Sequence, residues 1–158
     1  MRTYGKLTLI GIIGAAVLAV FLQAIHSLTG SNAYILLYNI DYIPLLKAWD
    51  QRPVVGVIFH IIFCIASVIL LYAMLKMVHL QRSLTAYVLI YTMGSAMLYP
   101  LTGLSNHPPE LGDLTSWLYW TLGHFIYSII VGLLVIRQKE RGAQQDAQSS
   151  QRIIRMQR

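Results

Sequence analysis

Charge is scarce in this sequence, and the scarcity excludes an ordinary soluble domain. Only 11% of the 158 residues are charged and 56% are hydrophobic, whereas soluble domains carry about 25% charged residues. Cysteine is almost missing as well: Cys64 is the only one, so no disulfide can form within the chain. Basic residues outnumber acidic ones, twelve to six. They do not form a basic face with interleaved aromatic residues, so we expect no nucleic-acid partner.

The motifs of common enzyme and cofactor classes are also missing. The chain contains no Gly-x-Ser-x-Gly, no His-Glu-x-x-His and no glycine-rich phosphate loop. It also lacks the Cys-x-x-Cys-His haem-attachment pattern and any His-x-x-x-His pair. These absences favour a role without catalysis, and we predict no cofactor.

Long apolar runs are what the chain does contain. Four of them cover most of the sequence, at residues 7–28, 54–78, 84–104 and 117–136. Each is close to the ~20 residues that a helix needs to cross ~30 Å of hydrocarbon, and the only charged residue within them is Lys76. No small-x-small cleavage site follows the first run, so we expect it to stay as a helix. The sequence predicts an all-α integral membrane bundle of four transmembrane helices within residues 1–137.

The positions of the basic residues predict the orientation of this bundle. With four crossings, only Lys47 and Arg52 fall in loops on the side opposite the termini, and the other ten basic residues lie on the side of the termini. Cytoplasmic loops of membrane proteins carry an excess of Lys and Arg. We therefore expect both termini in the cytoplasm and the protein in a bacterial inner (cytoplasmic) membrane, with the lipid bilayer as its first partner.

The connection between the first two helices, residues 31–52, has an aromatic pattern. A stripe at helical spacing is formed by Tyr34, Tyr38, Tyr42, Leu45 and Trp49. Tyr and Trp favour the interface between membrane and water, and Pro44 should kink the segment. The pattern fits a connector that lies along the membrane surface, or a lid over a pocket on the outer side.

Two further segments have a clear local signal. Pro100 and Gly103 should end or distort the third helix near the outer surface. The tail, residues 138–158, is basic and rich in Gln and Ser, which predicts a mostly disordered cytoplasmic segment. Its last residues, 152–158, could rest on anionic lipid.

The histidines carry the main candidate chemistry. His60 and His124 lie seven residues inside their helices, about 10 Å deep at 1.5 Å per residue. Ionisable residues within a membrane normally face the bundle interior or a water-filled cavity, so both should point inward at matching depth. The predicted pocket consists of His60, His124, Tyr127, Ser67 and Tyr99.

Four interpretations of this pocket stay open. The histidines could be packed hydrogen-bonding groups, or they could sense pH, because imidazole titrates near ~6.5. They could also ligate haem or a divalent metal, with His26, His107, Glu110 and Asp113 as further metal ligands in the outer loops. Finally, a histidine could act as the general base of an intramembrane enzyme.

Small residues in the helices suggest where partners could bind. Close helix contacts in membranes use glycine and alanine, and Gly11, Gly14, Gly94 and Gly132 are candidates. They could join copies of this chain in a homo-oligomer. They could equally join it, as an accessory subunit, to another membrane protein.

Several short motifs, taken together in their order, resemble the YagU-like family of small bacterial inner-membrane proteins. They are His60-Ile61-Ile62-Phe63, Tyr99-Pro100-Leu101-Thr102-Gly103-Leu104, Pro108-Pro109 and Gly123-His124. The resemblance implies a small polytopic inner-membrane protein associated with tolerance of acid or envelope stress, without an established reaction or cofactor. The first loop is shorter here than in the family pattern, so a function housed in that loop is not expected of this chain.

Overall fold

The computed structural model describes residues 2–41, 43, 45–46, 49 and 52–156, with side chains described up to residue 138. These residues form helices and connections without a strand, which confirms the predicted all-α class. The elements are α1 (Arg2–Thr29), η1 (Ala33–Leu37), α2 (Pro53–Met77), α3 (Leu84–Leu98), η3 (Tyr99–Leu104) and α4 (Leu114–Met156).

Four segments are long and apolar enough to cross a membrane: Thr3–Thr29, Pro53–Met77, Leu84–Leu104 and Leu114–Gln138. They coincide with the four predicted runs to within a few residues. Their outer faces expose large apolar side chains such as Val20, Leu70 and Met74, which water would not tolerate in such number but lipid chains do. The chain is a multi-pass membrane protein.

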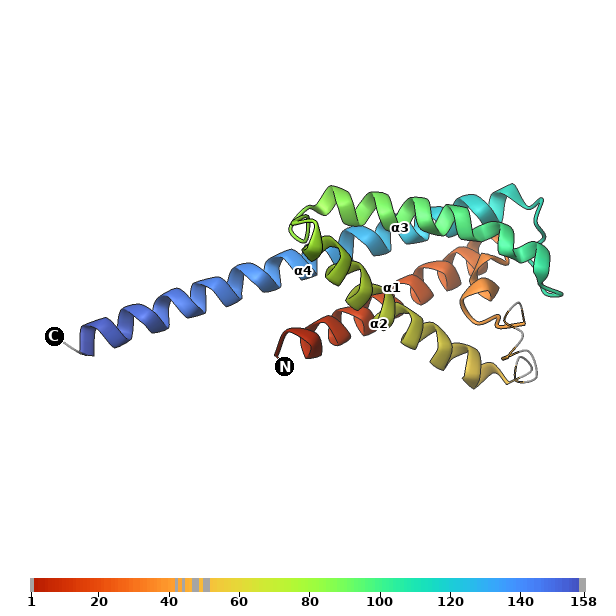
Figure 1. Cartoon of the computed structure of the whole chain (residues 1–158). Helices are drawn as coiled ribbons and strands as arrows, with labels where there is room; N and C mark the ends of the chain where they lie inside the picture. Colours follow the sequence, from red (N-terminus) through yellow and green to blue (C-terminus); the bar gives the residue numbers. More distant parts are fainter. Residues whose placement is uncertain (1, 42, 44, 47–48, 50–51, 157–158) are drawn as a thin grey trace.

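The four helices run alternately up and down (Figure 1). One end of the bundle carries the N-terminus, the turn at residues 78–83 and the extension of α4; we call it the terminal end. The other end carries the connections at residues 30–52 and 105–113; we call it the loop end (Figure 1).

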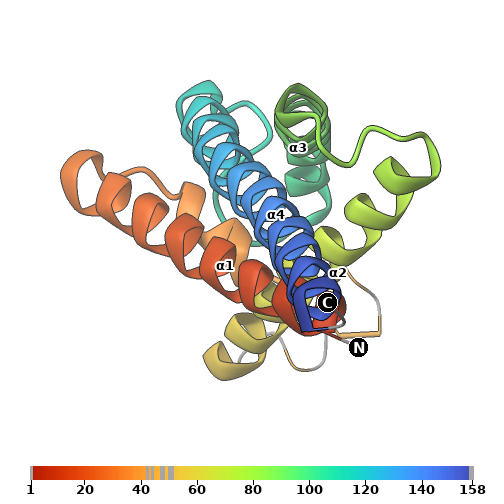
Figure 2. The same cartoon turned by 90° about the vertical axis from the view of Figure 1, so that its left-hand side faces the viewer.

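The helices do not pack in a closed ring. The well-packed pairs are α1 with α2, α1 with α4, and α3 with α4. The spatial order is therefore α2–α1–α4–α3, and α2 and α3 diverge from their short turn toward the loop end (Figures 1 and 2). The bundle is open along the seam between α2 and α3.

Glycines set how closely the packed pairs approach. A Cβ atom on Gly11 of α1 would lie 2.6 Å from the Cα atom of Ile65 in α2, and one on Gly132 of α4 would lie 2.7 Å from the side chain of Leu84 in α3. Gly14 meets the ring of Tyr127 in the same way. These three glycines, expected at contacts with partners, thus make contacts inside the chain, and of the four candidate glycines Gly94 alone has open space at its Cβ position.

The ends of the helices follow the local signals. Pro53 opens α2 at its first turn, a position where proline loses no hydrogen bond. At Tyr99 and Pro100 the third span changes from α-helix to the 3₁₀-helix η3, which confirms the predicted distortion near the loop end. Ser83 caps the start of α3, because its hydroxyl accepts the N–H of Ala86 at 3.3 Å.

The disorder expected of the tail stays a prediction, and its described backbone is helical. The backbone of α4 continues as a helix from Leu114 to Met156, past the membrane span (Figure 1). The composition permits this helix: the tail contains no proline and only Gly142 among glycines, and it is rich in Gln and Arg, both of which favour helix.

The connection at residues 31–52 is not a single aromatic helix in its described part. η1 turns back into the bundle and buries Ala33 and Leu37, and Ile40 after it is buried too, whereas Leu45 is 92% exposed. Tyr42 and Pro44 of the predicted stripe lie outside the described residues. The first half of the connection therefore packs into the loop end, as a lid would.

Candidate functional site

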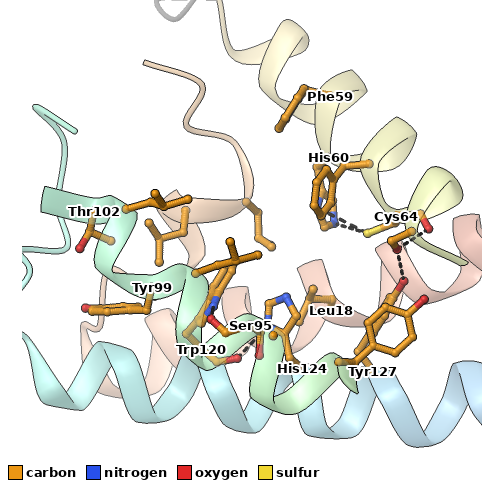
Figure 3. Close-up of a pocket in the computed structure, with 18 of the residues that line it drawn as sticks. Leu18, Phe59, His60, Cys64, Ser95, Tyr99, Thr102, Trp120, His124 and Tyr127 are labelled. Atoms are coloured by element: carbon orange, nitrogen blue, oxygen red, sulfur yellow. Dashed lines mark hydrogen bonds between the residues drawn. The ribbon is translucent and has the colours of Figure 1, made fainter. Parts of the chain in front are cut away.

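A cavity of about 330 Å³ lies along the open seam, toward the loop end. Its wall comes from all four helices, from η1 and from η3 (Figure 3). The five residues predicted from the sequence all line it: His60, Ser67, Tyr99, His124 and Tyr127. The structure thus brings together side chains that are far apart in the sequence. They come from α2, η3 and α4.

His60 on α2 is 6% exposed and is held by two neighbours. Its Nε2 lies 3.2 Å from the carbonyl oxygen of Ala15 in α1, which can only accept, so Nε2 carries the proton. Nδ1 is then a lone-pair nitrogen, 3.8 Å from the Cys64 thiol one turn further along α2. The ring of Tyr38, from the segment after η1, meets the imidazole edge-on at 6.1 Å.

His124 on α4 is held in a similar way from the opposite wall. Its Nδ1 donates to the carbonyl oxygen of Trp120 at 2.8 Å, and its ring stacks against the Trp120 indole with centroids 4.2 Å apart. Nε2 is then the lone-pair nitrogen, and it makes no hydrogen bond within the described part of the chain. The ring of His124 points into the cavity from α4, and that of His60 enters from α2 (Figure 3).

A cluster of hydroxyl groups continues the cavity toward the terminal end. The hydroxyls of Ser67 and Tyr127 lie 3.3 Å apart, and Ser67 also donates to the carbonyl oxygen of Cys64 at 2.9 Å. Tyr91 of α3 packs edge-on against Tyr127 with centroids 5.0 Å apart. Ser67 and Tyr127 therefore link α2 to α4 across the cavity floor.

Tyr99 lines the cavity as predicted, and its hydroxyl is bound to the backbone outside it. It lines the cavity with its ring, but its hydroxyl donates to the carbonyl oxygen of Asp113 at 2.9 Å. This bond ties the start of η3 to the start of α4. Tyr99 therefore stabilises the wall of the cavity, and its hydroxyl is already in use.

Two tryptophans that the sequence analysis did not select hold α3 and α4 together. The indole Nε1 of Trp120 donates to the carbonyl oxygen of Ser95 at 3.0 Å, and that of Trp117 donates to Ala96 at 3.1 Å. Their spacing of three residues on one helix face was the available signal. Their partners could not be predicted from the sequence, because every residue type has a backbone carbonyl group.

The loop end is closed by hydrogen bonds between the two long connections. The carboxylate of Asp41, which is 6% exposed, accepts the backbone N–H of Asn106 at 2.7 Å and the hydroxyl of Ser105 at 3.2 Å. The hydroxyls of Ser31 and Ser116 lie 2.8 Å apart. These contacts tie the connection after α1 to the connection before α4 and to the first turn of α4.

Two groups outside the spans have shifted pKa values. The backbone N–H of Ser116, 2.9 Å from the Asp113 carboxylate, and the hydroxyl of Ser116 hold the pKa of Asp113 below its ordinary value. Asp113 thus caps α4 in its ionised form. Burial raises the pKa of the Tyr38 hydroxyl, so Tyr38 presents a neutral hydroxyl beside the site.

The geometry does not favour metal or haem ligation. Within the described residues, no group of three His, Cys, Asp or Glu side chains is placed to hold a metal ion, so the outer set of His26, His107, Glu110 and Asp113 does not converge. To serve as an axial haem ligand through Nε2, His60 would have to give up its bond to Ala15.

Fold and site together define a four-span membrane protein with an intramembrane cavity that contains two histidines. Comparisons of the chain with models of protein families, with curated proteins and with solved structures found no match.

Proposed function

We propose that this chain is a multi-pass protein of the bacterial inner membrane that helps the cell to tolerate acid, with a YagU-like relationship that rests on the motifs quoted above. In this proposal, the orientation of the protein in the membrane follows from the positions of its basic residues. Arg2, Lys6, Arg82 and Arg137 all belong to the terminal end of the bundle, and an excess of basic residues favours the cytoplasmic side. The cavity then faces the outer half of the membrane, where external acid arrives first.

The observation that carries the proposal is the placement of His60 and His124 on the same cavity. In each imidazole one nitrogen donates to a backbone carbonyl, so the other nitrogen is available to take up a proton. No Asp, Glu, Lys or Arg is among the described residues that line the cavity. Two protonations would therefore add two positive charges with no carboxylate to compensate them.

Such uncompensated charges favour a conformation that lets water reach the site, since buried charge without a partner is costly. The open seam between α2 and α3 offers a route for that change, because these two helices are not packed along their lengths. Protonation at low pH would thus bias the bundle toward a wider cavity, which is how histidine switches act in general.

The experiment follows the indole of Trp120, which stacks on His124 and whose fluorescence an adjacent imidazolium quenches. We expect the fluorescence of the purified protein to change as the pH is lowered from 7, and His60→Gln together with His124→Gln to abolish the change. His79→Asn is the control, because His79 is remote from the cavity lining and its positive φ of 59° suits Asn. An unchanged response in the double variant would overturn the mechanism.

The physiological part of the proposal needs a test in cells. A strain that lacks this chain should survive acid challenge less well than its parent, and the wild-type chain should restore survival. The double histidine variant, present in the membrane at the same level, should not. Equal survival of the deletion strain and its parent would remove acid tolerance from the proposal.

A further inference from the structure

The cavity is open toward the lipid through the seam between α2 and α3. Four apolar residues that line it are also exposed: Phe63 of α2 is 54% exposed, Ile90 and Leu98 of α3 are 46% and 49% exposed, and Leu101 of η3 is 40% exposed. They lie within the membrane spans, so their exposed faces meet acyl chains. A molecule already dissolved in the membrane can enter sideways between them.

Hydrogen-bonding groups around the cavity are left unused. Nε2 of His124 has no partner within the described residues. The hydroxyl of Thr102, which also lines the cavity, is buried and has no partner there either. Thr102 is 4% exposed. Buried polar groups are normally paired, so one free acceptor and one free hydroxyl on a single cavity point to an occupant that supplies the matching groups.

The charge of the cavity lining limits which head group an occupant can have. The part of the lining that the structure describes contains no Lys or Arg that would hold a phosphate or carboxylate. The head group must therefore be uncharged and must both donate and accept hydrogen bonds. Apolar side chains, among them Phe59, Phe63, Ile90 and Leu98, make up the remainder and suit a hydrocarbon chain.

We propose that the cavity binds one chain of a single-chain amphiphile with an uncharged hydroxyl or undissociated carboxyl head, which enters from the bilayer between α2 and α3. The volume of about 330 Å³ lies at the lower end of the range for small-molecule sites, ~300–1,000 Å³, which fits one chain and excludes a diacyl lipid. This inference goes beyond the acid response and does not depend on titration of the histidines, so either proposal can fail without the other.

Trp120 reports on occupancy because it lines the cavity. Trp49→Phe and Trp117→Phe leave it as the single tryptophan of the chain. In nanodiscs at one fixed pH, a bromine-labelled long-chain alcohol, and separately a bromine-labelled fatty acid, should quench its fluorescence in a saturable way. The unlabelled amphiphile should reverse the quenching. A bromine-labelled phosphatidylcholine serves as the probe for bulk lipid.

Gly94→Leu is the blocking variant. Gly94 lines the cavity and a Cβ atom there meets nothing within 4 Å, so a larger side chain can be introduced at the cavity wall. Gly5→Leu is the matched control, because Gly5 also has open space and lies outside the lining. Gly94→Leu should abolish saturable quenching, Gly5→Leu should leave it unchanged, and Thr102→Val should weaken binding by about fivefold.

Three results would overturn the inference. Quenching could be absent, which would mean that water alone occupies the cavity. It could be linear and equal for the bromine-labelled phospholipid, which would mean contact with bulk lipid only. It could also persist in Gly94→Leu while helical circular dichroism shows that variant to be folded. A response to the alcohol, to the fatty acid or to both supports the site and identifies the head group that it takes.

Discussion

Replacement of Gly11 by alanine tests whether the contact between α1 and α2 is as close as the structure has it. A Cβ atom at Gly11 would lie 2.6 Å from the Cα atom of Ile65. Carbon atoms in contact prefer about 3.5–4.0 Å, so the helices would have to separate by about 1 Å. Ala15 is one turn along α1 on the same face, and its carbonyl oxygen accepts the bond from His60 at 3.2 Å. That bond would lengthen beyond hydrogen-bonding distance.

The magnitude follows from three contributions. Overpacking of a well-packed contact costs about 1–3 kcal/mol, and loss of the bond between Ala15 and His60 costs about 1 kcal/mol more. Alanine in place of glycine favours helix by about 1 kcal/mol. We expect Gly11→Ala to lower the free energy of unfolding by about 1–3 kcal/mol.

The assay is unfolding by sodium dodecyl sulfate, followed by circular dichroism in the same mixed micelles for each variant. Gly94→Ala is the control, because its new Cβ atom meets nothing within 4 Å and only the helix propensity changes. If Gly11→Ala is as stable as Gly94→Ala, the close contact at Ile65 is not present and the placement of His60 loses its support.

Two further predictions concern the loop end. Asp113→Ala removes the cap of α4 and should lower the free energy of unfolding by about 0.5–2 kcal/mol. Folding lowers the pKa of Asp113, so the stabilisation by the cap is complete above the unfolded pKa of ~3.9 and is lost as the pH falls through the pKa of the folded protein. Unfolding of both proteins between pH 7 and 3 should show the difference shrinking in acid, and a difference independent of pH would refute the cap. Ser31→Ala and Ser116→Ala should show a coupling energy of about 0.5–1.5 kcal/mol in a double-mutant cycle, since the two hydroxyls lie 2.8 Å apart. Strictly additive effects on the free energy of unfolding would mean that the connection after α1 is not bound to α4 at this point.

The spans were predictable because the bilayer imposes them. A helix that crosses hydrocarbon needs about 20 apolar residues, and runs of that length place α1 to α4 almost without further argument. Their pairing was not predictable, because helices that face lipid are apolar on all sides and show no stripe that marks the interior. The contact of Gly11 with Ile65 could not be singled out from other contacts of small residues.

The residues that line the site could be predicted from the sequence, but their hydrogen-bond partners could not. Ionisable residues are costly in lipid, so the inward orientation of His60 and His124 followed from their chemistry, and both do line one cavity. Their partners are the backbone carbonyls of Ala15 and Trp120, which every residue type provides. The bond from Asn106 to Asp41 joins residues 65 positions apart, and irregular loops have no periodicity that could predict it.

The packing order α2–α1–α4–α3 has a consequence for how the protein is made. As the chain leaves the ribosome from its N-terminus, α1 and α2 can complete their mutual contacts before the second half exists. α3 then reaches the membrane with no well-packed neighbour until α4 follows, because α4 is the helix that joins it to α1. Assembly of this bundle therefore requires α4 to dock onto α1, and the cavity takes shape only once it has done so.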